Sequence, residues 1–260
     1  MLGWTQEGAS VKVTVYEVGP RDGLQFLQHT VETQDKRNLI DSLYKAGIEN
    51  IEEVSFAHPK VIPQMADAEK VFTGRGAGLV MNKRGFDRAM ISGVKKINIV
   101  LSPCENFNIK SFRMTRSELM FNYFSFMNKI PKENVKDAKV FGNTVVFSDT
   151  IGIGNESQVR KMAKIAFEEG MIPALHLHHD GDENKPISLV RTGLLAGIKQ
   201  FDSSIGGLGG CPMVKNSGAN LSTETLVKHL DAWGLETGIK NLTASLKIVK
   251  RIKQEPLLLV

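Results

Sequence analysis

The chain of 260 residues is poor in cysteine and has no long apolar run. Cys104 and Cys211 are its only cysteines, which excludes a disulfide framework and favours a reducing compartment. No apolar stretch reaches the roughly 18 residues that a membrane helix requires. Residues 1–7 lack a basic region followed by an apolar stretch, so a signal peptide is not expected. We therefore expect a cytoplasmic protein, with the mitochondrial matrix as the alternative for a eukaryotic source.

Charge of one sign is not concentrated anywhere in the chain. The formal net charge is +5, but lysine and arginine are scattered. Basic stripes interleaved with aromatic residues are absent, so neither nucleic acid nor a membrane is an expected partner. A basic balance can attract an anionic small molecule such as an acyl-CoA or a nucleotide, although an ordinary solvated surface explains it equally well.

The chain does contain short β-branched runs that alternate with longer amphipathic patterns. This alternation predicts a parallel sheet with right-handed crossovers. The length suits one α/β barrel, typically about 250 residues, so we expect residues 1–260 to form a single domain. The predicted strands are 13–18, 51–56, 78–82, 97–102, 144–149, 174–178 and 199–204. The predicted helices are 33–46, 82–93, 117–129, 156–169, 186–197, 222–233 and 242–252. Four of them have a glycine suited to a C-terminal cap at or just after their end, namely Gly47, Gly93, Gly170 and Gly197.

The strand count falls one short of a closed barrel. The pattern predicts seven strands, whereas this kind of barrel has eight. Between the fourth strand and Thr144 there is room for one helix and then only residues 131–143, while a βαβ unit takes about 30 residues or more. Residues 132–139 are too polar for a buried strand. We therefore expect a (β/α)8-type barrel that lacks its fifth strand and most of the accompanying helix.

Polar side chains follow several of the predicted strands directly. Arg21 and Asp22 come after the first strand and Gly19-Pro20, where the chain must turn. A surface turn with a local ion pair explains them equally well if they are taken alone. In an α/β barrel, however, polar groups at the carboxyl ends of strands build the active site.

A second polar cluster is His176-Leu177-His178 at the end of an apolar strand. Residues two apart in a strand point to one face, so both rings can reach one cation, while His179 points the other way. Neutral imidazole is a frequent metal ligand, although a lone buried histidine is more often a satisfied polar group.

A glycine-rich stretch, residues 206–212, follows the last predicted strand, and Asn220 comes soon after it. The stretch fails the dinucleotide-binding pattern because Pro212 stands where the third glycine should be, and it lacks a Walker lysine. A mobile loop that carries Cys211 fits better, since such loops exclude water from a reaction. Cys211 is either a proton donor or an inert small residue.

One carboxylate, two imidazoles and one amide form a mixed nitrogen and oxygen ligand set. Such a set without thiolate favours Mg²⁺ or Mn²⁺ over zinc.

Four segments together resemble the 3-hydroxy-3-methylglutaryl-CoA (HMG-CoA) lyase family of metal-dependent TIM barrels. They are Glu-Val-Gly-Pro-Arg-Asp-Gly-Leu-Gln, Ile-Glu-Glu-Val-Ser-Phe-Ala-His-Pro-Lys-Val-Ile-Pro-Gln-Met-Ala-Asp, Ser-Asp-Thr-Ile-Gly and Gly-Leu-Gly-Gly-Cys-Pro. The similarity runs from about Val13 to Ile239. It implies retro-Claisen cleavage of HMG-CoA to acetyl-CoA and acetoacetate, as in leucine degradation and ketogenesis, by a homodimer.

The resemblance also implies roles for individual residues. Asp22, His176, His178 and Asn220 match the family's metal ligands. Arg21 corresponds to the arginine that stabilises the developing enolate, Cys211 to the cysteine of the mobile loop, and Glu52 to a further catalytic group. We expect His176 to act as the base. The substrate contacts implied are Gln25, Asp149, Gly207 and Gly209.

The chain departs from the family in the loop after His178, which is about two residues longer, at Met213 in place of an aromatic residue, and in the absent fifth strand. Two alternatives to the lyase therefore stay open. One is a degenerate barrel that binds metal or acyl-CoA with little turnover, and the other is an acetyl-CoA-dependent synthase of 2-hydroxy acids.

Overall fold

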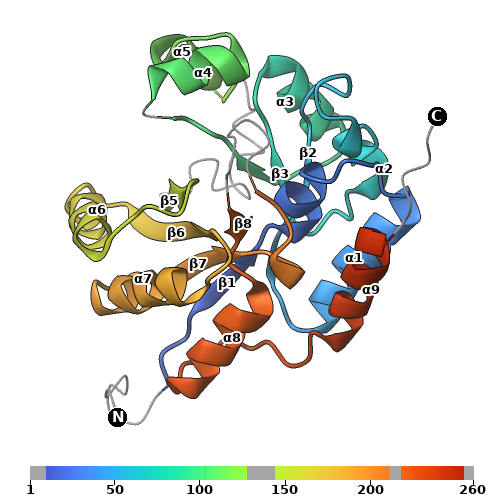
Figure 1. The fold of residues 1–260 in the computed structure, drawn as a ribbon. Coiled ribbons are helices and arrows are strands. Elements are labelled where there is room, and N and C mark those ends of the chain that lie inside the picture. The colour runs from blue at the N-terminus through green and yellow to red at the C-terminus, as the bar shows by residue number, and fades with distance from the viewer. Residues whose placement is uncertain (1–9, 103, 128–143, 211–217, 255–260) are drawn as a thin grey trace. The chain divides into compact units, whose positions relative to one another are not determined.

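The computed structural model describes residues 10–102, 104–127, 144–210 and 218–254 (Figure 1). The chain divides into two compact units. The larger unit comprises Met1–Ile51 and Asn143–Val260, and the smaller one Glu52–Gly142. The expectation of a single domain stays a prediction.

The larger unit is built on parallel strands. β1 (Thr14–Glu17) pairs on one side with the start of β2 (Asn50–Ser55) and on the other with β7 (Gln200–Ser203). β6 (Ile172–His179) lies between β7 and β5 (Thr144–Asp149). The predicted strands of this unit and their parallel pairing are therefore confirmed.

A short strand that the sequence pattern did not predict completes this arrangement. β8 (Ala219–Asn220) runs antiparallel to the end of β6, with His178 opposite Asn220. Because of this pairing, two of the predicted ligands lie side by side across a ladder.

Helices with one apolar face cover these strands. They are α1 (Thr33–Lys45), α6 (Glu156–Glu168), α7 (Asn184–Leu195), α8 (Thr223–Ala232) and α9 (Thr243–Gln254), all within one or two residues of the predicted bounds. Gly47, Gly170 and Gly197 have φ of 97°, 68° and 91°, which confirms their expected place as caps. The buried apolar side chains of β6, α7 and α8 form one core beneath the site.

The smaller unit continues β2 with two more parallel strands, β3 (Ala77–Leu79) and β4 (Lys96–Asn98). Its helices are α2 (Ala68–Val71), α3 (Lys83–Ile91), α4 (Glu105–Phe112) and α5 (Arg116–Met127). The sequence pattern missed α4, since its apolar residues do not fall on one face. Among the described residues between β4 and β5 there are two helices and no strand, as expected for the shortened segment, while residues 128–143 lie outside the described part.

None of the helices in the described ranges is long and apolar enough to cross a membrane.

One buried carboxylate joins three parts of the larger unit. Glu17, at the end of β1, is fully buried and accepts hydrogen bonds from the backbone N–H of Gly19 (2.7 Å) and of Ile205 (2.9 Å). It also accepts one from the hydroxyl of Thr223 (2.6 Å). Burial raises the pKa of Glu17 to about 7, and the three donors only partly oppose this rise.

We expect the Glu17→Gln variant to lack one component of the pH dependence of stability. The pKa of Glu17 is about 7 in the folded protein and 4.5 in the unfolded chain. The contribution of the protonated carboxyl is complete below pH 4.5 and is lost as the pH rises through 7, by up to about 3 kcal/mol. Urea unfolding of both proteins between pH 4.5 and 8 measures it. Parallel curves for the two proteins would contradict the assignment.

Candidate functional site

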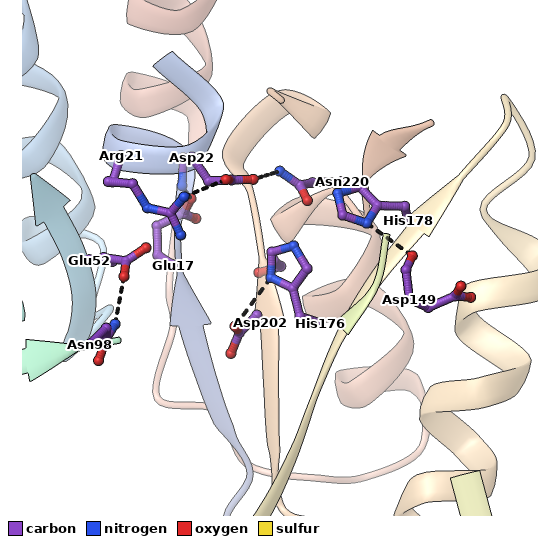
Figure 2. A network of polar contacts seen from close by, with 12 residues as sticks. Glu17, Arg21, Asp22, Glu52, Asn98, Asp149, His176, His178, Asp202 and Asn220 are labelled. Carbon is purple, nitrogen blue, oxygen red and sulfur yellow. Dashed lines mark hydrogen bonds and ion pairs between the residues drawn. The ribbon is translucent and has the colours of Figure 1, made fainter. Parts of the chain in front are cut away.

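The structure brings the predicted metal ligands together at the carboxyl ends of β1 and β6. One ligand atom from each of Asp22, His176 and His178 lies within 4.8 Å of the others. The side-chain amide of Asn220 donates a hydrogen bond to the Asp22 carboxylate, and Asn220 thus completes the predicted set (Figure 2). All four residues belong to the larger unit.

Asp22 is placed by a single turn of π-helix, η1 (Gly19–Gly23), where the sequence predicted an ordinary turn. The backbone N–H groups of Arg21, Asp22 and Gly23 all donate to the carbonyl of Val18, the last residue before the turn. Single π turns are rare and occur frequently at functional sites. This one turns the Asp22 carboxylate towards the end of β6.

The Asp22 carboxylate is partly buried but stays ionised. Arg21 Nη1 donates to Asp22 Oδ1 at 2.5 Å, and Asn220 Nδ2 donates to Asp22 Oδ2 at 2.8 Å. Burial alone would raise the pKa of Asp22, but Arg21, His176 and Asn220 together hold it below its usual value. An ionised carboxylate in this place is ready to bind a cation.

The two imidazoles lie on one face of β6, as predicted from their spacing. Their ring centroids are 4.9 Å apart, and each ring is fixed through Nδ1. His176 Nδ1 lies 3.2 Å from Asp202 Oδ2, and His178 Nδ1 lies 3.0 Å from the backbone oxygen of Asp149. A second hydrogen bond of this kind is what orients metal-binding histidines, with Nε2 left for the ligand.

The two rings differ in basicity. Burial and the neighbouring His176 lower the pKa of His178 to about 4. Burial also opposes charge on His176, but the hydrogen bond and the charge of Asp202 outweigh it, so the pKa of His176 lies above its usual value. His178 is therefore neutral near pH 7, the form that binds metal, and His176 is the more basic of the two.

Two polar atoms of this cluster are buried without a hydrogen-bond partner. They are His178 Nε2 and Asn220 Oδ1. Asn220 Nδ2 donates both to Asp22 and to the carbonyl of Leu208, which leaves Oδ1 as the free acceptor. Buried polar atoms are rarely left unpaired, and both atoms are lone-pair donors on predicted ligands. The residues present therefore fit a divalent cation.

The glycine-rich stretch packs against this cluster. Gly209 has φ of 110°, and a Cβ there would lie 2.4 Å from Asn220 Nδ2. Glycine at this position thus lets the backbone approach the amide of Asn220. Gly207 also has a positive φ and lies near the carbonyl of Asn220. Residues 211–217, with Cys211, are outside the described part.

The other predicted site residues that the structure describes are Gln25, Asp149 and Glu52, and each has contacts of its own. Gln25 Oε1 is buried without a partner. The Asp149 carboxylate accepts from the backbone N–H of Ile153 and Gly154, so it stabilises the turn after β5. Glu52 belongs to the smaller unit, where it accepts a hydrogen bond from Asn98 at 2.6 Å. Their predicted roles stay predictions.

Sequence reasoning missed two carboxylates next to the ligands, Asp202 and Glu17. Each stands inside an apolar strand that the pattern predicted as buried, and a carboxylate in such a strand must be paired. The presence of a carboxylate in a strand predicted to be buried is thus the signal by which the sequence could have identified them.

Comparison with known proteins identifies the family of the chain. The HMGL-like family model matches residues 12–142. The chain is 31% identical to hydroxymethylglutaryl-CoA lyase of Bacillus subtilis over 283 aligned positions, which cover 95% of each chain. It is 29% identical to 3-hydroxy-3-isohexenylglutaryl-CoA/hydroxymethylglutaryl-CoA lyase of Pseudomonas aeruginosa, with 88% of each chain covered.

A solved structure gives the same result. An HMG-CoA lyase from Acinetobacter baumannii, in complex with coenzyme A and 3-methylmalate, superposes with a TM-score of 0.82 at 27% identity. The match covers 95% of this chain and 92% of that one. The predicted family is confirmed: the chain belongs to the HMG-CoA lyases, which are carbon–carbon lyases with a barrel-type α/β fold.

Proposed function

We propose that the protein cleaves 3-hydroxy-3-methylglutaryl-CoA to acetyl-CoA and acetoacetate with the help of a divalent metal. The observation that carries this proposal is the cluster of Asp22, His176, His178 and Asn220, with two buried lone-pair donors unpaired. The relatives support the substrate, since their names refer to HMG-CoA and to a related branched acyl-CoA.

Asp22 Oδ, His176 Nε2, His178 Nε2 and Asn220 Oδ1 would hold the metal. When bound, it would polarise the 3-hydroxyl and carboxylate oxygens of the substrate and lower the pKa of the hydroxyl. The mixed nitrogen and oxygen set supports Mg²⁺ or Mn²⁺.

His176 is the proposed base for the hydroxyl proton. The hydrogen bond to Asp202 makes it more basic than His178 and would stabilise the protonated ring. Because Nδ1 is engaged by Asp202, a proton and a cation would compete for Nε2. His176 Nε2 can serve only one of these roles at a time, so Asp22, His178 and Asn220 would hold the metal while His176 acts as the base, and His176 would be the fourth ligand otherwise.

The C2–C3 bond then breaks, acetoacetate leaves, and the electron pair passes to the thioester oxygen of an acetyl-CoA enolate. Arg21 is proposed to stabilise that oxygen, since Asp22 fixes its guanidinium at the site. A proton finally adds to C2, and Cys211 is the proposed donor. Glu52 is proposed as a further catalytic group, and the proposed substrate contacts are Gln25, Asp149, Gly207 and Gly209.

A homodimer in the cytoplasm is proposed for the assembled enzyme. Among the described strands β5 pairs only with β6, and Val146, Ile165 and Phe167 of β5 and α6 are exposed apolar residues that would support association. Light scattering measures the oligomeric state.

One observation favours a second candidate, a binding protein with little turnover. The alignment with the Bacillus subtilis lyase spans 283 positions, whereas the whole chain has 260 residues, so the relative contains segments that this chain lacks. Strand number, tilt and shear are linked in a barrel, and a displacement of about 1 Å can cost roughly a hundredfold in rate.

We expect the purified protein to release acetyl-CoA from HMG-CoA when Mn²⁺ or Mg²⁺ is present. Chelation should abolish turnover because the hydroxyl would lose its polarisation, and added Mn²⁺ should restore it. A coupled assay for acetyl-CoA with EDTA-treated and reloaded protein measures this. A folded, Mn²⁺-binding protein without turnover would instead support the binding protein.

The Arg21→Gln variant should separate binding from chemistry. We expect kcat to fall about 10²–10³-fold, because a fixed donor to the enolate oxygen is lost. The affinity for Mn²⁺ should be retained, since removal of a positive charge beside Asp22 does not oppose a cation. Steady-state kinetics and Mn²⁺ titration measure the two effects, with Arg160→Gln on exposed α6 as the control. An unchanged kcat would exclude the proposed role of Arg21.

A further inference from the structure

We propose that Glu17 is a positioning residue of the metal site, where its carboxylate fixes the three segments that carry Asp22, the glycine-rich stretch and Asn220. The inference rests on the proposed function only in that this site binds a divalent metal. Glu17 accepts hydrogen bonds from Gly19, Ile205 and Thr223, none of which is a predicted ligand.

One oxygen of Glu17 holds two of these segments. Glu17 Oε1 accepts from Gly19 N, the first residue of η1, which carries Asp22. The same oxygen accepts from Ile205 N, the first residue of the 3₁₀ turn η4 (Ile205–Gly207). That turn leads into Leu208, whose carbonyl accepts from the amide of Asn220. A shift of Oε1 would therefore move both turns.

The other oxygen holds the third segment. Glu17 Oε2 accepts from the hydroxyl of Thr223, the first residue of α8, which follows β8 and Asn220 directly. Thr223 Oγ1 also lies 2.9 Å from Ser203 Oγ, and either hydroxyl can be the donor. The segment after Asn220 is thus fixed to the ends of both β1 and β7.

The fit around this carboxylate is close. A Cβ on Gly19 would lie 2.6 Å from Glu17 Oε1, so glycine is needed for the carboxylate to reach the turn. Burial of a carboxyl group is costly unless its oxygens are satisfied, and here both are. A side chain that served only to fill space would be apolar, which favours the linking role.

A second carboxylate also contacts the start of the glycine-rich stretch. Glu224 Oε2 accepts from Gly206 N at 3.0 Å, and Lys253 Nζ donates to the carbonyl of Gly206 at 2.9 Å. These contacts anchor only the start of the glycine-rich stretch. Glu224 belongs to α8 and therefore also joins that stretch to α8, but of the described acidic residues in these contacts only Glu17 joins it to the Asp22 turn as well.

The test compares Mn²⁺ affinity in Glu17→Ala, Glu17→Gln and a matched control, Glu53→Ala. Glu53, in the smaller unit, is also buried and also accepts from two backbone N–H groups and one threonine hydroxyl, of Thr73 and Gly76. Its loss removes hydrogen bonds of the same kinds without touching a segment that carries a predicted ligand. Isothermal titration with MnCl₂ gives Kd, and circular dichroism confirms folding.

We expect Glu17→Ala to weaken Mn²⁺ binding 10- to 100-fold, as loss of outer contacts does at metal sites, and Glu53→Ala to change Kd less than threefold. Glu17→Gln should rescue binding to within threefold. Its oxygen can accept from Gly19 and Ile205, and its amide can donate to Thr223, whose hydroxyl then turns to Ser203. A general loss of stability would not be rescued in this way.

Wild-type Kd for a folded Glu17→Ala, or an equal loss in Glu53→Ala, overturns the inference. If Glu17→Ala does not fold, Thr223→Val decides, because it removes the link from Glu17 to α8, together with the contact to Ser203, and leaves Glu17 bonded to both turns. A loss of several-fold in Mn²⁺ affinity is then expected, and an unchanged Kd overturns the proposal. Failure of the wild-type protein to bind Mn²⁺ would overturn the proposed metal site itself, which is a distinguishable result.

Discussion

The Asp22 carboxylate, ionised and partly buried, is the constraint on which this site depends. Burial disfavours its charge, and the protein offsets that cost with Arg21, His176 and the Asn220 amide, which come from η1, β6 and β8. Each of these partners must therefore lie within hydrogen-bond or short Coulomb distance of one point. A cation bound there would add to the same compensation through its positive charge. It would also give a partner to the lone pairs that His178 Nε2 and Asn220 Oδ1 leave unpaired.

The sequence was sufficient wherever one period of the backbone decides the geometry. The period of two in a strand placed His176 and His178 on one face, and the period of 3.6 located α1, α6, α7, α8 and α9 within one or two residues. It failed where a local pattern has no such period. The π turn that carries Asp22 and the weakly amphipathic α4 are the two cases.

The residues that support the ligands were missed for a different reason. Glu17 is bonded to Ile205 and Thr223, which lie 188 and 206 positions away, and Asp202 is bonded to His176 across a parallel strand pair. No local pattern contains such partners. The sequence indicates such residues only because a carboxylate within an apolar strand is unusual. That signal does not identify the residue with which the carboxylate pairs.

The predicted metal ligands and the shortened segment belong to different units of this chain. All four predicted ligands, and the carboxylates Glu17 and Asp202 that support them, belong to the larger unit. The shortened segment follows β4 and belongs to the smaller one, as does Glu52. The contacts that place the ligands are thus made without the segment that the chain lacks. A change in the smaller unit therefore leaves the contacts of the four predicted ligands in place, whereas it can reach Glu52, the proposed further catalytic group.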